Sequence, residues 1–170
     1  MLTIILPATE HHPEAKLTLE HSLVSLSKWE ALHQKVFFSR EEKTIEETYS
    51  YVRQMLLVEE PLDFEARLTN EHLLAIQAYI NSPQSATTFR KIPGERPSNE
   101  IITNELMYFW LVQFNIPFYP VETWHLNRMM TLVKICGIKQ SKPKKMSKAE
   151  QVAEMRRINE ERRRQLGSSG

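Results

Sequence analysis

Residues 122–147 read ETWHLNRMMTLVKICGIKQSKPKKMS, where an apolar helical segment gives way to a basic segment that proline interrupts. The apolar side chains of the first half recur at helical spacing: they are Leu126, Met129, Met130, Val133 and Ile135. Glu122 near the start and Lys134 near the end suit the helix dipole. Gly137 favours a helix end, and Pro143 prevents a continuous helix through the surrounding lysines. A helical body is therefore predicted to end here and a basic arm to begin.

The formal charges divide in the same place. The chain has a net charge of +1, but residues 1–138 hold 12 Lys and Arg against 17 Asp and Glu, whereas residues 139–170 hold 10 against 4. An acidic body thus carries a basic arm. We predict a body of residues 1–138, a basic linker of residues 139–146 and a basic C-terminal helical arm of residues 147–170.

The composition is typical of a water-soluble helical protein. Of 170 residues, 41% are hydrophobic, 25% are charged and only four are glycine, which excludes a glycine-rich phosphate loop. The single cysteine, Cys136, excludes an internal disulfide and a zinc site built from cysteines. No apolar run approaches the roughly 18 residues that a membrane span needs. We therefore expect a cytosolic protein with no membrane partner.

The N-terminal part predicts a β-hairpin followed by a helix. Residues 2–6 and 16–20 have strand-like patterns, and the segment between them is rich in turn-forming residues. The next segment, residues 21–38, reads HSLVSLSKWEALHQKVFF, which is typical of a helix. Ser25 or Ser27 is the expected N-cap, because a serine hydroxyl can accept a hydrogen bond from a free amide of the first turn.

Two helices are predicted in the middle of the chain. Ser39 followed by Glu42 has the pattern of a capping box, and it precedes a stripe of apolar residues with helical spacing. The stripe consists of Ile45, Tyr49, Val52 and Leu56. After a loop, Thr69 or Asn70 is expected to cap a second helix that runs to about Ile80.

The last part of the body predicts a loop and a helix pair. Residues 81–99 are rich in proline and small polar residues, which indicates a loop. Residues 101–114 form a helix that is apolar nearly all round, so it is expected either at the centre of the core, paired with the helix of residues 124–135, or against a partner. Ser147 begins a second capping-box pattern, and residues 148–166 form a helix with a narrow apolar stripe that is expected to order on a partner.

No arrangement of residues indicates catalysis or metal binding. The six histidines lack the spacing that places two ligands on one helical face, and the glutamates of residues 41–47 are expected on a solvated surface. Cys136 is interpreted as a small core residue. Tyr119, Trp124 and His125 either line a pocket or anchor the packing at a helix entrance. We therefore expect no enzyme, no cofactor and no metal.

The basic arm supplies the candidate partner-binding residues. They are Lys139, Lys142, Lys144, Lys145, Arg156, Arg157, Arg162, Arg163 and Arg164. The arm is interpreted either as a solubilising tail or as a docking element for an acidic partner or nucleic acid. Nucleic acid is the less favoured of these partners, because the arm lacks interleaved aromatic residues for base stacking and the body is acidic.

Four segments resemble a family of short proteins of tailed bacteriophages. They are LEHSLVSLSKWE (residues 19–30), ATTF (residues 86–89), WHLNRMMTLVKICGIK (residues 124–139) and the ending PKKMS…RRRQLGSSG. Members of this family occur among tail-morphogenesis genes and are labelled tail assembly chaperones or hypothetical proteins. The resemblance covers nearly the whole chain, but it transfers no functional residue.

The resemblance implies a non-catalytic factor that binds the long helical tape measure protein, keeps it soluble and is displaced as tail-tube subunits polymerise. The expected fold is mainly α, with a compact helical body, a small N-terminal β-hairpin and a protruding C-terminal helix. The expected location is the host cytoplasm. Two alternatives remain: a structural subunit of the virion tail or neck, which would self-associate through the same apolar helix, and a small nucleic-acid-binding regulator that uses the basic arm.

Overall fold

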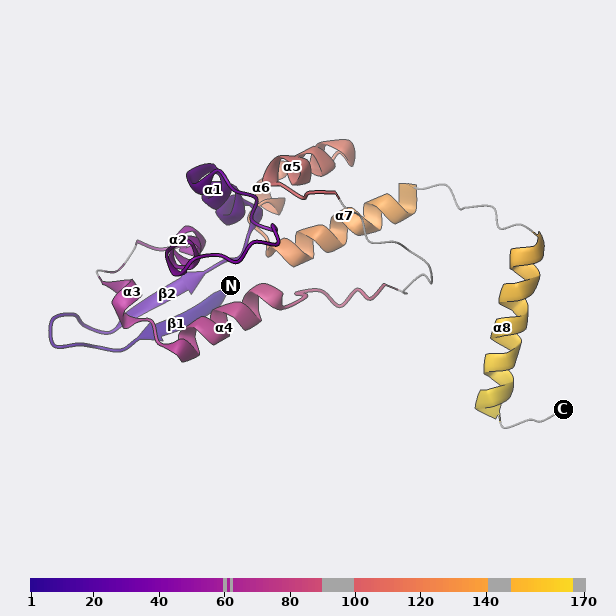
Figure 1. Cartoon of the computed structure of the whole chain (residues 1–170), viewed down its shortest axis with the longest axis horizontal. Helices are drawn as coiled ribbons and strands as arrows, with labels where there is room; N and C mark the ends of the chain where they lie inside the picture. The colour runs from indigo at the N-terminus through magenta and orange to yellow at the C-terminus, as the bar shows by residue number, and fades with distance from the viewer. Residues whose placement is uncertain (60, 62, 90–99, 141–147, 167–170) are drawn as a thin grey trace. The chain divides into compact units, whose positions relative to one another are not determined.

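The computed structural model describes residues 1–59, 61, 63–89, 100–140 and 148–166 (Figure 1). The chain separates into two units, Met1–Ile138 and Lys139–Gly170. The fold is mainly helical, with a two-stranded antiparallel sheet at the N-terminus and a C-terminal helix. The predicted fold class is therefore confirmed.

The N-terminal hairpin pairs β1 (Leu2–Leu6) with β2 (Ala15–Leu19) in the predicted antiparallel arrangement. Period-two alternation turns one set of side chains into the core, and the four buried members are Ile4, Leu6, Leu17 and Leu19. Helix α4 (Asn70–Asn81) packs beside β1 (Figure 1). The hairpin thus forms one wall of the core of the first unit.

Helix α1 (Leu23–His33) is capped by Ser22, so the prediction of Ser25 or Ser27 as N-cap is wrong. The amide of Ser25 donates to Ser22 Oγ at 3.2 Å, and the amide of Ser22 donates to Ser25 Oγ at 2.9 Å. Ser25 is therefore the third residue of the helix and the second half of a capping box. A serine in place of the usual Glu or Gln at that position concealed the pattern in the sequence.

Helix α2 (Ile45–Met55) also begins at a different capping box from the predicted one. Thr44 is the N-cap: its hydroxyl oxygen accepts from the Glu47 amide, and its own amide donates to Glu47 Oε2 at 2.9 Å. Ser39 and Glu42 lie before the helix in a region of turns and bends. The same motif therefore occurs twice in this segment, and the second copy starts the helix.

The buried face of α2 differs from the predicted stripe. Ile45 is 77% exposed, whereas Tyr51 and Met55 are buried together with Val52. The hydroxyl of Tyr51 lies 2.5 Å from His21 Nδ1, so the polar end of this ring has a partner within the core. That contact allows the Tyr51 side of the helix to face the core, because it supplies the hydrogen-bond partner that a buried hydroxyl needs.

Helix α3 (Phe64–Arg67) is a single turn, and α4 follows it with Thr69 as N-cap, which was one of the two predicted caps. The guanidinium of Arg67 is buried and fastens the loop of the hairpin. It donates to the carbonyl oxygen of Pro7 at 2.9 Å and to that of Pro13 at 2.7 Å.

Three helices complete the first unit: α5 (Asn104–Gln113), α6 (Phe118–Val121) and α7 (Leu126–Gln140). Helix α7 continues through Gly137, so the predicted helix end at this glycine is wrong. A glycine inside a helix costs only about 1 kcal/mol relative to alanine, which does not by itself end a helix.

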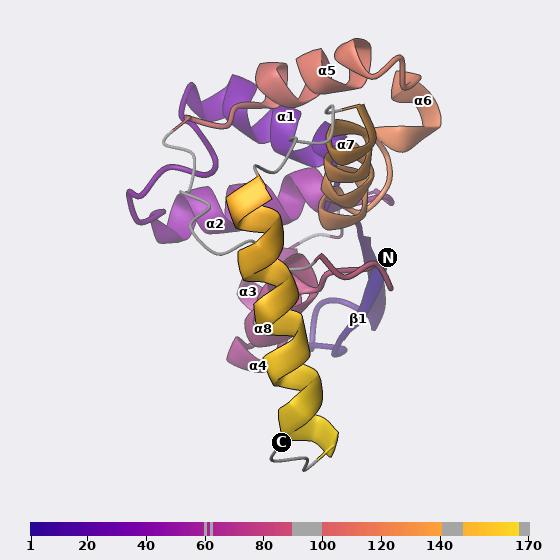
Figure 2. The ribbon, with the colours of Figure 1, turned by 90° about the vertical axis from the view of Figure 1, so that its right-hand side faces the viewer.

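Helix α5 packs on α1, and the two lie side by side in both views (Figures 1 and 2). The predicted pairing of α5 with α7 is therefore wrong, although both helices contribute buried residues to the core. Glu30 on α1 explains the difference: its Oε2 accepts hydrogen bonds from the Asn104 amide at 2.8 Å and from Asn104 Nδ2 at 2.7 Å. A buried carboxylate thus holds the start of α5, and Met107 and Leu111 are its buried apolar residues.

The second unit contains helix α8 (Lys148–Leu166), which agrees with the predicted helix of residues 148–166. Its predicted cap, Ser147, lies outside the described residues, as do linker residues 141–146 and loop residues 90–99. Loop residues 82–89 are described and contain neither helix nor strand, as predicted.

Candidate interaction surfaces

Large apolar side chains are exposed along α5 and α6. We call this the α5–α6 apolar surface, and it consists of the exposed residues Phe109, Val112, Phe118 and Tyr119 together with the partly buried Ile116 between the two helices. Val112 is 63% exposed and Tyr119 is 77% exposed. Val112, Ile116 and Phe118 line one shallow hollow. Contiguous exposed apolar side chains of this kind mark protein-binding surfaces more often than isolated ones do.

The α5–α6 apolar surface arises because α5 is apolar nearly all round while only one of its faces contacts α1. Met107 and Leu111 point into the core, so Phe109 and Val112 must point outward. The segment from Glu100 to Asn127 contains no lysine or arginine. The surface therefore lies on a part of the chain whose only formal charges are negative.

A contact between α5 and the residue after α6 fixes this surface. Tyr108 donates a hydrogen bond to Glu122 Oε2 at 2.9 Å, and its ring meets that of Phe118 edge-on with centroids 5.1 Å apart. Desolvation and the Glu122 carboxylate raise the pKa of Tyr108 to about 12, so this hydroxyl stays protonated at neutral pH and can donate. The surface is therefore pre-formed.

The three aromatic residues predicted near the helix entrance do not share a pocket in the described structure. Tyr119 is exposed, His125 is buried, and Trp124 is half-buried beneath the guanidinium of Arg128, which lies 4.2 Å from the ring centroid. Trp124 and His125 therefore anchor the packing at the start of α7, and the alternative interpretation as a pocket lining is wrong.

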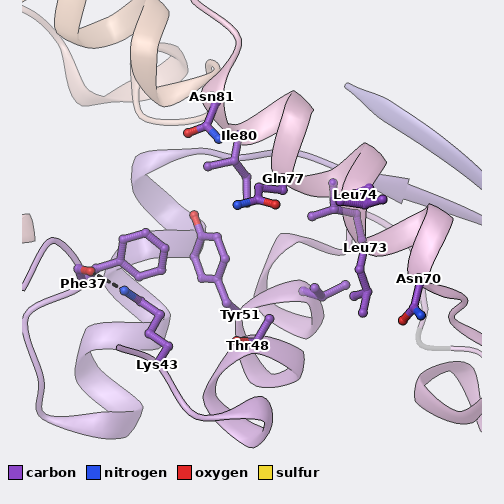
Figure 3. A pocket seen from close by; sticks show the side chains of 12 residues that line it. Phe37, Lys43, Thr48, Tyr51, Asn70, Leu73, Leu74, Gln77, Ile80 and Asn81 are labelled. Atoms are coloured by element: carbon purple, nitrogen blue, oxygen red, sulfur yellow. Dashed lines mark hydrogen bonds between the residues drawn. The ribbon is translucent and has the colours of Figure 1, made fainter. Parts of the chain in front are cut away.

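A groove runs between α2 and α4, and we call it the α2–α4 groove (Figure 3). Its volume is about 640 Å³. Twelve residues line it: Phe37, Lys43, Thr48, Tyr51, Val52, Asn70, Leu73, Leu74, Ile76, Gln77, Ile80 and Asn81. Sequence reasoning missed this groove, because its walls come from two helices whose relative placement only the fold defines.

Lys43 supplies the one charged side chain among the described residues that line the groove. Its ammonium donates to the carbonyl oxygen of Phe37 at 2.6 Å and lies 4.3 Å from the centroid of the Phe37 ring (Figure 3). Desolvation lowers the pKa of Lys43, and the nearby Glu47 carboxylate opposes that shift. The groove thus contains a partly desolvated cation beside apolar side chains.

The predicted basic residues are not gathered into one site. Lys139 lies exposed in the last turn of α7, whereas Lys142, Lys144 and Lys145 lie outside the described residues. The five arginines of α8 are exposed: Arg156, Arg157, Arg162, Arg163 and Arg164. Val152 and Met155 on the same helix are also exposed, at 54% and 61%. Helix α8 therefore presents both positive charge and a narrow apolar stripe.

A buried polar network joins the segment before α1, the helix α4 and the segment before α7. The rings of His21 and His125 pack edge-on with centroids 5.1 Å apart, and His125 Nε2 lies 3.1 Å from the carbonyl oxygen of Tyr79. The hydroxyl of Tyr79 donates to Glu20 Oε1 at 2.6 Å. Burial is the main reason that the pKa of His21 falls to about 4, and burial also lowers the pKa of His125.

The described ranges show neither a metal cluster nor a membrane span. No three His, Cys, Asp or Glu side chains within these ranges gather as a metal site requires. None of the described helices combines the length and apolar character needed to cross a membrane.

No protein-family model, no curated protein and no solved structure matches the chain.

Two segments that are far apart in sequence, residues 19–22 and 124–127, meet in the structure. The amide of Leu126 donates to the carbonyl oxygen of His21 at 2.7 Å, and Ser22 and His125 form a β-bridge. These segments join parts of the fold that are far apart in sequence. Their side chains therefore serve packing, and recognition has to be sought on the exposed surfaces.

Proposed function

We propose that this protein is a non-catalytic factor of phage tail assembly that binds the tape measure protein through the α5–α6 apolar surface. The observation that carries the proposal is the exposure of Phe109, Val112, Phe118 and Tyr119 on neighbouring helices of the first unit. A long helical client that exposes apolar stripes before assembly would be kept soluble by covering those stripes. The sequence resemblance supplies the identity of that client, and the proposed location is the host cytoplasm.

Co-expression with the tape measure protein tests this proposal. The wild-type chain is expected to keep the client in the soluble fraction and to co-purify with it. Val112→Glu is expected to weaken that binding by about tenfold or more, because it places a charge at the centre of an apolar contact. Ile45→Glu is the matched control, since Ile45 is also an exposed β-branched residue, 77% exposed against 63% for Val112, but lies on α2.

Three outcomes would contradict the proposal. The client's solubility could be the same with and without this protein, or Val112→Glu could bind the client as tightly as Ile45→Glu does. Mass spectrometry of purified virions could also find the protein in stoichiometric amounts, which would identify a structural subunit of the particle and not a transient chaperone. Circular dichroism of both variants verifies that they remain folded.

The exposed arginines of α8 are proposed to contact acidic segments of the same client. Replacing Arg156, Arg157, Arg162, Arg163 and Arg164 with glutamine in the full chain is expected to weaken client binding by about threefold to tenfold at low salt and much less at high salt. Titration of labelled client at two salt concentrations measures this. Equal affinity of the wild type and the variant at low salt would show that the arm is a solubilising tail.

A further inference from the structure

The α2–α4 groove combines an apolar lining with an unbalanced charge. None of the described residues that line it is acidic, and Lys43 is the only cation among them. Lys43 forms no ion pair in the described part of the chain. The Glu47 carboxylate acts on Lys43 only through its field, because Glu47 Oε1 accepts from Lys35 and Oε2 accepts from the Thr44 amide.

We propose that the α2–α4 groove binds an amphipathic helix of another protein, with a row of apolar side chains in the groove and a carboxylate beside that row paired with Lys43. The apolar row would contact Leu73, Leu74 and Ile80, which face the groove from α4 (Figure 3). This site shares no residue with the α5–α6 apolar surface. The inference is therefore independent of the proposed function.

The length and walls of the groove favour a helix as the occupant. Residues at both ends of α4, Asn70 and Asn81, line it, so it is about 16 Å long at the helical rise of 1.5 Å per residue. That length accommodates about three turns of a second helix. The walls are side chains of two helices, whose backbone amides are already bonded within each helix, so an extended strand would find few partners there.

The position of Lys43 favours a carboxylate on that helix. One proton of the ammonium is donated to the Phe37 carbonyl, and two remain for a further acceptor. The ring of Phe37 and the apolar lining exclude part of the water around this nitrogen, so a carboxylate would be paired under weaker screening than on an open surface. A basic or neutral helix would leave the lysine unpaired, which gives the site its selectivity.

Peptide-display selection against the purified full chain tests the inference. The library consists of random 16-residue peptides. We expect enrichment of sequences with apolar residues at i, i+3 or i+4, and i+7, together with an Asp or Glu next to that row. A synthetic, fluorescein-labelled copy of the most enriched peptide then gives the affinity by fluorescence polarisation.

Two variants locate the binding site. Leu74→Glu is expected to weaken the peptide's affinity at least tenfold, because Leu74 is 64% exposed on the groove wall and the new carboxylate repels an acidic peptide. Ile45→Glu, at an exposed position of α2 outside the groove, is expected to bind as the wild type does. Thermal unfolding by circular dichroism verifies that each variant is folded.

A double substitution cycle tests the predicted ion pair. Lys43→Met retains most of the apolar stem but removes the charge, and it is expected to weaken binding about tenfold. Changing the peptide's Glu to Gln should weaken binding to the wild type by a similar factor and should have little effect on binding to Lys43→Met. Lys43→Arg should retain most of the affinity, since it retains the charge.

Each contrary result would overturn the inference. A selection that enriches no peptide above the starting library would show that the groove is not a peptide site. Enriched peptides without an acidic residue would show that the partner chemistry is wrong. Equal binding to Leu74→Glu and Ile45→Glu would place the peptide elsewhere on the protein. None of these results depends on whether Val112→Glu affects the tape measure protein.

Discussion

Replacing Glu30 with alanine is expected to lower the free energy of unfolding by about 3 kcal/mol. The Glu30 side chain is 7% exposed, and three donors converge on its two oxygens. Oε1 accepts from the Phe37 amide at 2.7 Å, and Oε2 accepts from the amide and the side-chain nitrogen of Asn104 at 2.8 and 2.7 Å. Alanine would leave all three donors buried without a partner, in two segments that pack against α1.

Urea denaturation followed by fluorescence measures this effect, since Trp29 is adjacent to Glu30 and buried. Glu30→Gln should lose less, about 2 kcal/mol, because its amide oxygen can still accept while its NH₂ group faces other donors. Glu42→Ala is the control at an exposed glutamate and is expected to change stability by less than about 0.5 kcal/mol. A Glu30→Ala protein as stable as the control would show that the carboxylate does not hold α5.

Acidification from pH 6.5 to pH 4 is expected to destabilise the folded protein by about 3 kcal/mol through His21 alone. Burial lowers the pKa of His21 from its ordinary value of 6.5 to about 4. Between these two pH values the unfolded chain binds the proton and the folded chain does not, so acid favours unfolding. The contribution of neutral, buried His21 to the free energy of unfolding is fully present above pH 6.5, and it is lost as the pH falls from 6.5 to 4.

Free energies of unfolding at several pH values, measured for the wild type and for His21→Asn, isolate this effect from that of the carboxylates. The variant is expected to be less stable at pH 7 because Tyr51 loses its partner, but its stability should fall less between pH 6.5 and pH 4. His125 contributes in the same direction, since burial lowers its pKa too. Identical slopes for the wild type and His21→Asn would refute the assignment.

The order and type of the main elements could be predicted from local pattern, but their helix starts could not. The hairpin follows from two short β-branched and apolar runs around a turn, and Thr69 follows from ordinary capping chemistry. At α1 and α2 several serines, threonines and glutamates offered competing caps. Which capping pair starts each helix depends on which side chains the helix buries. Those side chains are set by tertiary contacts such as the one between Tyr51 and His21.

The packing partner of α5 and the α2–α4 groove were beyond prediction for a related reason. Short separation in sequence favoured a pair of α5 with α7, but the Glu30 carboxylate binds Asn104 from 74 residues away. A buried glutamate has no signature that distinguishes it from a solvated one in a single sequence. The sequence predicts the apolar excess of α5, but only the fold shows that Phe109 and Val112 are its exposed members.

The long-range bonds of α1 have a consequence for synthesis on the ribosome. Glu30 Oε2 lacks its two donors until Asn104 has emerged, and the carbonyl oxygen of His21 receives its hydrogen bond later still, when the amide of Leu126 emerges. Such non-local closure slows folding relative to helices that pair with their sequence neighbours. We therefore expect α1 to pack against its sequence neighbour α2 early in elongation, and α5 and the segment before α7 to close over α1 only as the last third of the first unit leaves the exit tunnel.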